Sequence, residues 1–371
     1  MKTLTSTGSS IRQYPSPCLL FDRQKITCAA DVLKSLTHKY NCRFLMAAKA
    51  LRSKTVYQIL NHRLNGFDVS NFNEYNILPD VLDKKTIWFT NPILDSISFN
   101  DLTRKFNDLI VSIETLTQGL MIIKQNRRVC LALRLSTRPL EKNNKQARHS
   151  RFGILPDEIK NFGTLKQSIL GLHIHKGTFD GSEINTVHDY LKMAEYALEI
   201  TKTHKIKMKI LNLGGGLHHL ARQDLDTLLY KLRLMINPQT LIYFEPGQYF
   251  FKDAGFAAGQ VMSIKKQREI IVTLNLSGSC HLKWSQPRYC SLAINKGKKT
   301  ARVVFCGPTC YESDRLGEFA IPLTDVHKLK TGSVVMFSNI SGYSASWNSG
   351  FNGILPAKLL FQKTMRSLHH M

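Results

Sequence analysis

Short apolar runs alternate with amphipathic segments from residue 23 to about residue 246. Eight runs have the length and the β-branched or aromatic content of buried strands. They are RFLMAA (43–48), GFDVS (66–70), TIWFT (86–90), DLIVSI (108–113), VCLALRL (129–135), ILGLHIH (169–175), KILNLG (209–214) and LIYFEP (241–246). The segments before the first and seventh runs, 23–40 and 182–204, have helical periodicity. Eight strands alternating with helices predict a TIM-like (β/α)8 barrel.

The pattern changes after Pro246. REIIVTLNLSG (268–278), ARVVFCGP (301–308) and GSVVMFSNI (332–340) indicate strands separated by turns rather than by helices. We therefore expect a C-terminal antiparallel β domain over 250–371. Residues 1–24 contain SPCLLFD (16–22), which would add an N-terminal strand to that domain. The barrel would then cover 25–249.

Composition indicates the cellular location and the kinds of partner of this protein, but says little about its chemistry. The net charge is +24, but lysine and arginine are spread along the chain, with one dense run at 138–151. With no aromatic residues interleaved among the basic ones, the charge indicates a solvated surface, and no nucleic-acid partner is expected. The eight cysteines show neither CxxC nor zinc spacing. No run spans a membrane and no signal peptide is evident, so a cytoplasmic protein with free thiols is predicted.

The carboxyl ends of the predicted strands carry the candidate chemistry, because the active sites of such barrels lie there. Each strand ends in a polar residue or glycine: Lys49, Asp68, Asn91, Glu114, Arg134, His173 with His175, Gly214–Gly216 and Glu245. One such residue would be weak evidence, whereas eight at one rim predict an active site. Lys49 is the most unusual, since a lysine rarely follows a buried strand without a partner.

Three consecutive glycines, Gly214 to Gly216, follow the seventh strand. Such a loop lets backbone amides approach a phosphate, and barrel phosphate sites use the loops after strands seven and eight. The spacing differs from the GxGxxG fingerprint of a Rossmann site. A lysine, a phosphate loop and a carboxylate together predict pyridoxal 5'-phosphate (PLP), with Lys49 forming the imine and Glu245 pairing with the ring nitrogen. No metal site is expected.

Several motifs resemble those of the PLP-dependent decarboxylases of the alanine racemase fold (fold type III). This family includes diaminopimelate, ornithine and carboxynorspermidine decarboxylases. The resemblance extends from residue 16 to residue 356. Its motifs are AAKA (47–50), GFDVSN (66–71), GLHIHKGT (171–178), LNLGGG (211–216), EPG (245–247), GPTCYESD (307–314) and SGYSASWNSGFNG (341–353).

The resemblance implies roles for residues of both domains. Lys49, His175 and Cys310 would be catalytic, with His175 stacked on the cofactor ring and Cys310 reaching the active site of the other subunit of a homodimer. The cofactor would be bound by Lys49, Asp68, Arg134, His175, Gly214, Gly215, Gly216, Glu245, Gly247 and Tyr343. Arg134 could instead be a structural partner of Asp68 or Glu114, and His173 is expected to pack rather than react.

Within the family, the carboxynorspermidine decarboxylase branch fits best. LSGSCHLKW (276–284) and FNGILP (351–356) resemble its segments, and Tyr311 stands where ornithine and diaminopimelate enzymes have an acidic residue. The resemblance implies a carboxy-lyase acting on carboxynorspermidine or carboxyspermidine in polyamine (spermidine) biosynthesis. Tyr311, Glu312 and Asp314 would bind the cationic tail of this small-molecule substrate.

Other functions remain open. The substrate could be that of an ornithine or diaminopimelate enzyme, or an intermediate of siderophore synthesis. An amino-acid racemase of this fold is less favoured, because the resemblance implies arginine rather than Glu245 at the ring nitrogen. A non-catalytic PLP-binding regulator usually consists of the barrel alone, which disagrees with the β domain.

Overall fold

Two compact units make up the computed structural model, which describes residues 15–79, 85–94, 99–100, 103, 109–125, 129–141, 149–177, 186–290 and 299–363. One unit covers Ala29–Tyr249, and the other combines the chain up to Cys28 with the chain from Phe250 onward. Two segments for which we made predictions from the sequence lie outside the described residues. They are the N-terminal residues 1–14 and the centre of the basic run, 142–148.

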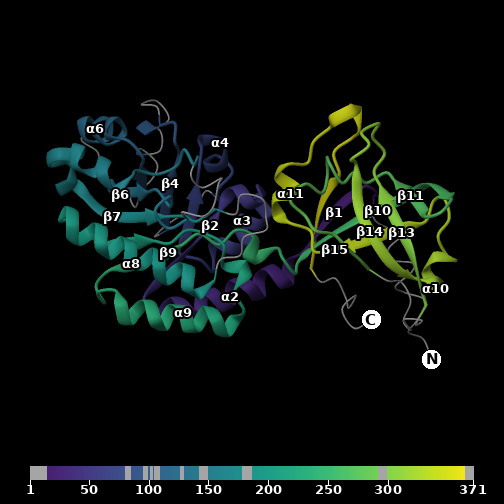
Figure 1. The fold of residues 1–371 in the computed structure, drawn as a ribbon, viewed down its shortest axis with the longest axis horizontal. Coiled ribbons are helices and arrows are strands. Elements are labelled where there is room, and N and C mark those ends of the chain that lie inside the picture. Colours follow the sequence, from purple (N-terminus) through teal and green to yellow (C-terminus); the bar gives the residue numbers. More distant parts are fainter. Residues whose placement is uncertain are drawn as a thin grey trace. The chain divides into compact units, whose positions relative to one another are not determined.

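The first unit contains a closed barrel of eight parallel strands in chain order (Figure 1). The strands are β2 (Cys42–Ala47), β3 (Gly66–Val69), β4 (Thr86–Thr90), β5 (Leu109–Ile113), β6 (Cys130–Leu135), β7 (Ile169–Ile174), β8 (Ile210–Asn212) and β9 (Leu241–Phe244). Each strand overlaps one of the eight predicted runs, and β9 pairs with β2 to close the barrel. The predicted barrel is confirmed.

Helices connect most of these strands. They are α2 (Arg23–Tyr40), α3 (Lys54–Asn61), α4 (Phe72–Tyr75), α6 (Leu116–Lys124), α8 (Val187–His204) and α9 (Arg222–Met235). Helix α8 begins at a capping box in which Thr186 and Asp189 satisfy each other's backbone N–H groups. The connection before β7 is instead a 3₁₀ segment, η2 (Pro156–Ser168), which Gly163 interrupts with a φ of 49°. The further 3₁₀ turns of this unit are η1 (Ala48–Ala50), η3 (Leu217–His219) and η4 (Gln248–Phe250).

An apolar layer fills the barrel interior on the amino-terminal side of the strand ends that carry the candidate chemistry. Its members are Leu45, Trp88, Ile110, Ala132, Ile210 and Tyr243. On β7 the corresponding position is Gly171, which pairs with Ala132 on one side and Ile210 on the other. A Cβ atom there would lie 2.1 Å from Cγ1 of Ile210, so glycine makes room for the isoleucine. This layer closes the barrel below the candidate site.

The second unit is an eight-stranded, mostly antiparallel sheet. Its main path runs β12 (Arg288–Tyr289), β15 (Val334–Ser338), β10 (Gly255–Lys266), β11 (Ile270–Leu274), β13 (Thr300–Cys306) and β14 (Arg315–Pro322). Strand β1 (Cys18–Asp22) pairs antiparallel with β10 and parallel with β16 (Lys358–Gln362). The pair β11–β13 is also parallel, so the predicted antiparallel domain holds with two exceptions.

Only short helical segments occur in the second unit after β10. Within the described residues they are α10 (Leu323–Val326), α11 (Gly342–Ser346) and η5 (Phe351–Gly353). Across the described part of the chain, no helix has both the length and the apolar character needed to cross a membrane.

Candidate active site

A polar layer lies directly above the apolar layer of the barrel. Side chains two positions apart on a strand point to the same face. Ser112, Arg134, Asn212 and Glu245 therefore point inward like the apolar residues two positions before them, and strand pairing adds Asp68 and His173. All of these except Arg134 are buried. The rim residues predicted from β3, β6, β7 and β9 thus meet in the barrel interior.

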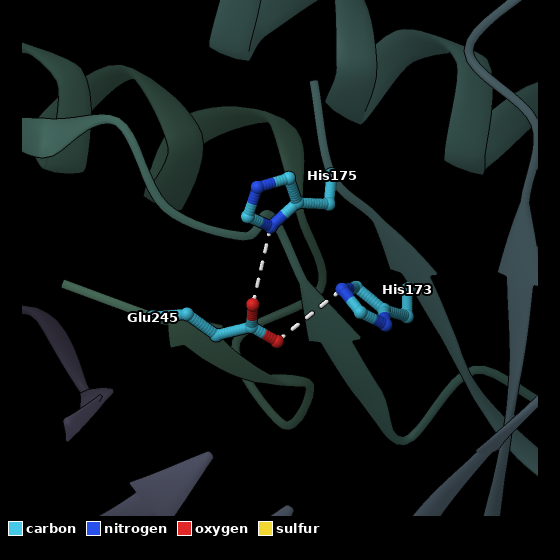
Figure 2. A group of neighbouring side chains, drawn as sticks. All are labelled: His173, His175 and Glu245. Carbon is cyan, nitrogen blue, oxygen red and sulfur yellow. Dashed lines mark hydrogen bonds and ion pairs between the residues drawn. The ribbon is translucent and has the colours of Figure 1, made fainter. Parts of the chain in front are cut away.

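Glu245 lies at the centre of this layer, and only 2% of it is exposed. Asn212 Nδ2 donates to its Oε1 over 2.7 Å. His173 Nε2 lies 3.2 Å from Oε1, and His175 Nδ1 lies 3.2 Å from Oε2. Figure 2 shows the two imidazoles directed at different oxygens of the one carboxylate. Three nitrogen groups therefore surround an acid that has been removed from water.

These surroundings keep Glu245 ionised. Burial alone would raise its pKa, but the imidazoles of His173 and His175 and the charge of Lys49 outweigh burial and hold the pKa well below its usual range. Asp68 behaves in the opposite way: burial and the nearby charge of Glu245 raise its pKa well above its ordinary value. Two carboxyl groups in one buried space oppose each other's ionisation, and here the surroundings move their pKa values in opposite directions, down for Glu245 and up for Asp68.

Burial favours the neutral form of both histidines of the layer. Burial lowers the pKa of His173 to about 3, and burial also lowers the pKa of His175. Burial and Glu245 thus act in opposite directions on the two imidazoles, and burial has the larger effect. A neutral imidazole carries one N–H, which can stabilise a carboxylate as a hydrogen-bond donor.

Lys49 lies in η1, the 3₁₀ turn that directly follows β2, and is half-buried. Two hydrogen bonds hold this turn: Tyr57 Oη donates to the carbonyl of Ala48 over 3.0 Å, and the N–H of Ala47 donates to the carbonyl of Pro246 over 3.1 Å. The second bond ties the lysine turn to the segment that follows Glu245. The positive charge of Lys49 lowers the pKa of both Asp68 and Glu245, so its ammonium group is close enough to interact with both carboxyl groups.

The glycine loop packs closely against His175 and Glu245. Gly214 and Gly216 have φ values of 68° and 93°, a region that favours glycine. A Cβ atom on Gly214 would lie 2.6 Å from His175 Nδ1, and one on Gly215 would lie 2.9 Å from the carbonyl oxygen of Glu245. Only glycine leaves room here for a backbone that must approach another group closely.

Asn212 joins the glycine loop to the carboxylate. Its Oδ1 accepts a 2.8 Å hydrogen bond from the N–H of Gly214, while its amide nitrogen donates to Glu245. Tyr190 Oη donates to the carbonyl of Gly215 over 2.5 Å from helix α8. The loop and the acid therefore form one hydrogen-bonded assembly.

Arg134 has structural partners. Its Nη1 donates to Glu114 Oε1 over 2.6 Å, and its guanidinium lies 4.6 Å from the ring centre of Phe152. Glu114 also accepts from the N–H of Gly153 over 3.1 Å. The structural role considered for Arg134 from the sequence is present, and its role in cofactor binding stays a prediction. Gly247 is buried just after Glu245, and its role also stays a prediction.

The other predicted site residues belong to the β unit. Cys310, Tyr311 and Glu312 are exposed there, and the N–H of Cys310 donates to Asn352 Oδ1 over 2.9 Å. Glu312 forms an exposed 2.9 Å ion pair with Arg315. Tyr343 is half-buried in α11. The functions assigned to these residues remain predictions.

Asp314 is buried inside its own loop. Its carboxylate accepts hydrogen bonds from Ser277 Oγ, Ser279 N and Thr309, with the Ser277 and Thr309 hydroxyls at 2.8 and 2.7 Å. Gly307 makes room for it, because a Cβ there would lie 2.1 Å from Asp314 Oδ2. Its predicted contact with substrate stays a prediction; what these bonds do is hold the loop that carries Cys310.

Replacing Asp314 by alanine should destabilise the β unit by about 3 kcal/mol at pH 7. The reason is that the Ser277 and Thr309 hydroxyls and the Ser279 N–H would lose their charged acceptor. Burial alone would raise the pKa of Asp314, but the hydrogen bonds from Ser279, Thr309 and Ser277 hold it below its ordinary value. A depressed pKa stabilises the fold above the unfolded-state pKa of about 3.9, and this contribution disappears as pH falls further. Thermal unfolding at pH 7 and pH 3.5 should show the penalty shrinking at the lower pH.

Glu312→Ala is the matched control for that experiment, because Glu312 lies two residues away and its side chain is 92% exposed. It should unfold like the wild type. Equal destabilisation by the two variants would contradict the structural role of Asp314.

Sequence reasoning missed several residues of the assembly. Asn212, Ser112 and Tyr190 were not selected, and His173 was expected only to pack. A signal was present for two of them: Ser112 and Asn212 are the polar residues in the otherwise apolar runs LIVSI and ILN, at inward positions. Nothing in the sequence of helix α8 distinguishes Tyr190 from its other buried residues.

Comparison with known proteins identifies what this arrangement is similar to. The chain is 24% identical to carboxynorspermidine/carboxyspermidine decarboxylase of Campylobacter jejuni, over 93% of this chain and 92% of that protein. It is 25% identical to diaminopimelate decarboxylase of Buchnera aphidicola, over 62% of this chain and 60% of that protein. No family model matches the chain.

Solved structures extend the similarity. Carboxynorspermidine decarboxylase from Campylobacter jejuni in complex with norspermidine superposes with a TM-score of 0.75 at 20% identity, covering 94% of each chain. Lysine/ornithine decarboxylase from Vibrio vulnificus in complex with cadaverine gives 0.77 at 19% identity, covering 96% of this chain and 97% of that one. The chain has the fold of these decarboxylases. The resemblance seen in the motifs is confirmed, since these relatives by sequence and neighbours by structure are carboxynorspermidine decarboxylase and related carboxy-lyases.

Proposed function

We propose that this chain is a PLP-dependent decarboxylase of an α-amino acid with a cationic tail, with carboxynorspermidine or carboxyspermidine as the substrate. The observation that carries the proposal is the buried Glu245, which is 2% exposed and has Asn212, His173 and His175 nitrogens within 3.2 Å, beside the turn that carries Lys49. A buried carboxylate is costly unless it has a cationic or hydrogen-bonded partner. The protonated ring nitrogen of PLP is such a partner.

The residues present fit this cofactor. Gly214 and Gly215 form a cradle with no room for a Cβ atom, as a backbone that approaches a phosphate requires. Lys49 supplies an amine, and its turn is tied by a backbone hydrogen bond to the segment after Glu245. Lys49 would hold the cofactor's aldehyde end, the glycine loop its phosphate and Glu245 its ring nitrogen.

When bound, PLP supplies an electron sink for the bond that breaks as the substrate loses its carboxylate. The residues of this chain would prepare that step. Glu245 would hold the proton on the ring nitrogen, because its own low pKa leaves its oxygens free to accept. His175, neutral and beside Glu245, would cover one face of the ring. Lys49 Nζ, or the Sγ of Cys310 from a second subunit, would return a proton to the substrate carbon.

The substrate and the assembly are part of the same proposal. The similarity to the Campylobacter carboxynorspermidine/carboxyspermidine decarboxylase supports a polyamine precursor. Glu312 has an exposed carboxylate that could meet an ammonium group, with Tyr311 and Asp314 beside it in the loop. We further propose a cytoplasmic homodimer, in which each subunit completes the active site of the other through Cys310.

A substrate panel tests this function. The PLP-loaded protein should release CO₂ from carboxynorspermidine or carboxyspermidine, and at least tenfold less efficiently from ornithine, lysine and diaminopimelate. Preference for lysine or ornithine would replace the proposed substrate by those of the Vibrio enzyme. A protein that binds no PLP would overturn the cofactor assignment and the reaction with it.

A further inference from the structure

A chain of buried side chains runs beneath Glu245 and joins three strands of the barrel. It begins at Trp88 on β4, continues through Ser112 on β5 and ends at His173 on β7. Trp88 Nε1 donates to Ser112 Oγ over 2.8 Å. Ser112 Oγ lies 2.8 Å from His173 Nδ1, and His173 Nε2 lies 3.2 Å from Glu245 Oε1. At most 1% of any of these three residues is exposed, so water does not compete for their bonds.

The chemistry of the groups favours one direction for the chain. The indole nitrogen can only donate, so Ser112 Oγ accepts from Trp88, and His173 Nδ1 at 2.8 Å is an acceptor within reach of the serine's own hydroxyl proton. A ring nitrogen that accepts carries no proton, and in a neutral imidazole the proton must then be on Nε2. That nitrogen faces a carboxylate, which would repel a lone pair. Both ends of His173 therefore favour the same tautomer.

We propose that Trp88 and Ser112 are positioning residues that lock His173 as the Nε2–H tautomer, so that this N–H, 3.2 Å from Glu245 Oε1, is turned toward the carboxylate and favours its charged form. The part of this inference that concerns the cofactor rests on the proposed function, since Glu245 is the group assigned to the ring nitrogen. The part that concerns His173 depends only on the barrel interior.

The charges around His173 agree with a neutral ring. Burial has the largest effect in lowering its pKa, and the positive charges of Arg134 and Lys49 act in the same direction, whereas Glu245 opposes them. Holding the ring neutral matters for Glu245, because an imidazolium could surrender its proton to the carboxylate. A neutral donor with Asn212 as a second donor stabilises the ionised form without that risk.

The same side chains are also possible metal ligands, and the tautomer bears on that role. Among the described residues, His173, His175 and Glu245 form the one group of metal-ligating side chains whose atoms come within 4.8 Å of one another. A metal ligand must offer a lone pair. With the proposed tautomer, a metal could bind His173 Nε2 only by displacing its proton.

Neutron diffraction from crystals of the full-length protein tests the tautomer directly. We expect deuterium on His173 Nε2, none on Nδ1, and the Ser112 hydroxyl directed at Nδ1. Deuterium on Nδ1, or on both nitrogens, would overturn the proposal. This measurement needs no turnover, so its result stands even if the protein proves to have another substrate.

Kinetics of the PLP-loaded enzyme tests whether His173 affects the protonation of Glu245. Ser112→Ala should lower kcat by roughly tenfold, as the loss of a positioning partner does in comparable buried networks, and should move the acid limb of the pH–kcat profile to higher pH. Ser112→Thr, which keeps the hydroxyl, should restore the profile. An unshifted profile in Ser112→Ala would overturn this role.

Thr90→Val is the matched control. Thr90 is the β4 residue paired with Ser112, and its buried hydroxyl has no hydrogen-bond partner among the described residues. Removing that hydroxyl should leave the pH profile where it is. A shift equal to that of Ser112→Ala would mean that the effect is general disturbance of the barrel and would overturn the proposal.

Discussion

Lys49→Ala should abolish decarboxylation, with a loss of about a thousandfold or more in kcat/KM. The lysine follows β2 directly and is the amine whose charge is felt at both Asp68 and Glu245. Alanine removes the group that would hold the cofactor's aldehyde end. The variant should also fail to retain PLP through dialysis, which visible absorption of the purified protein measures.

Lys54→Ala provides the comparison for that result. Lys54 lies five residues further on at the start of α3 and is exposed. It should leave both the absorption and the activity as they are. A Lys49→Ala protein that remains coloured and active would remove the basis of the proposed mechanism.

Glu245→Gln should lower kcat by about a hundredfold while leaving PLP bound. Glutamine has the same size and can still accept from Asn212, but it carries no charge with which to hold a proton on the ring nitrogen. The change therefore isolates the charge from the shape of the site. The measurement is the rate of CO₂ release at saturating substrate, together with a PLP titration.

An exposed glutamate on α8 gives the control, because Glu195→Gln changes the net charge equally without touching the barrel interior. That variant should keep the wild-type rate. Wild-type kcat in Glu245→Gln would show that the buried charge plays no part in the reaction.

Hydrophobic patterning was sufficient to predict the barrel. Each of the eight apolar runs overlaps a strand, because strands covered on both sides have no polar face to interrupt the run. The helix predicted over 23–40 is α2 with the same limits. The connection over 156–168 gave less signal: its Pro156 and Gly163 break a helix, and the structure forms a 3₁₀ segment instead.

The β unit was harder to predict in detail. Strand β10, with twelve residues, begins with the small residues of GFAAG and ends in the basic pair Lys265–Lys266, which alone are weak strand signals. Its pairing with β1, β11 and β15 decides its conformation, and such distant partners cannot be identified from local composition.

The candidate site was predicted as a set of strand ends but not as a network. Position at or just after the carboxyl end of a strand was enough to select Lys49, Asp68 and Glu245. The hydrogen bonds that connect Ser112, His173 and Asn212 depend on the stagger between strands, which places residues distant in sequence in one layer. The opposite pKa shifts of Asp68 and Glu245 also follow from this packing, because the sequence alone does not distinguish the two carboxyl groups.

The parallel pairing of β1 with β16 has a consequence for biosynthesis. Residues 18–22 leave the ribosome first, yet their neighbour over 358–362 follows more than three hundred residues later. The barrel, which is one continuous stretch, can fold during translation. Until β16 arrives, β1 has an open edge that could pair with another nascent chain. Stop codons just before residue 358 should therefore give aggregates, in which limited proteolysis would still recover a folded barrel.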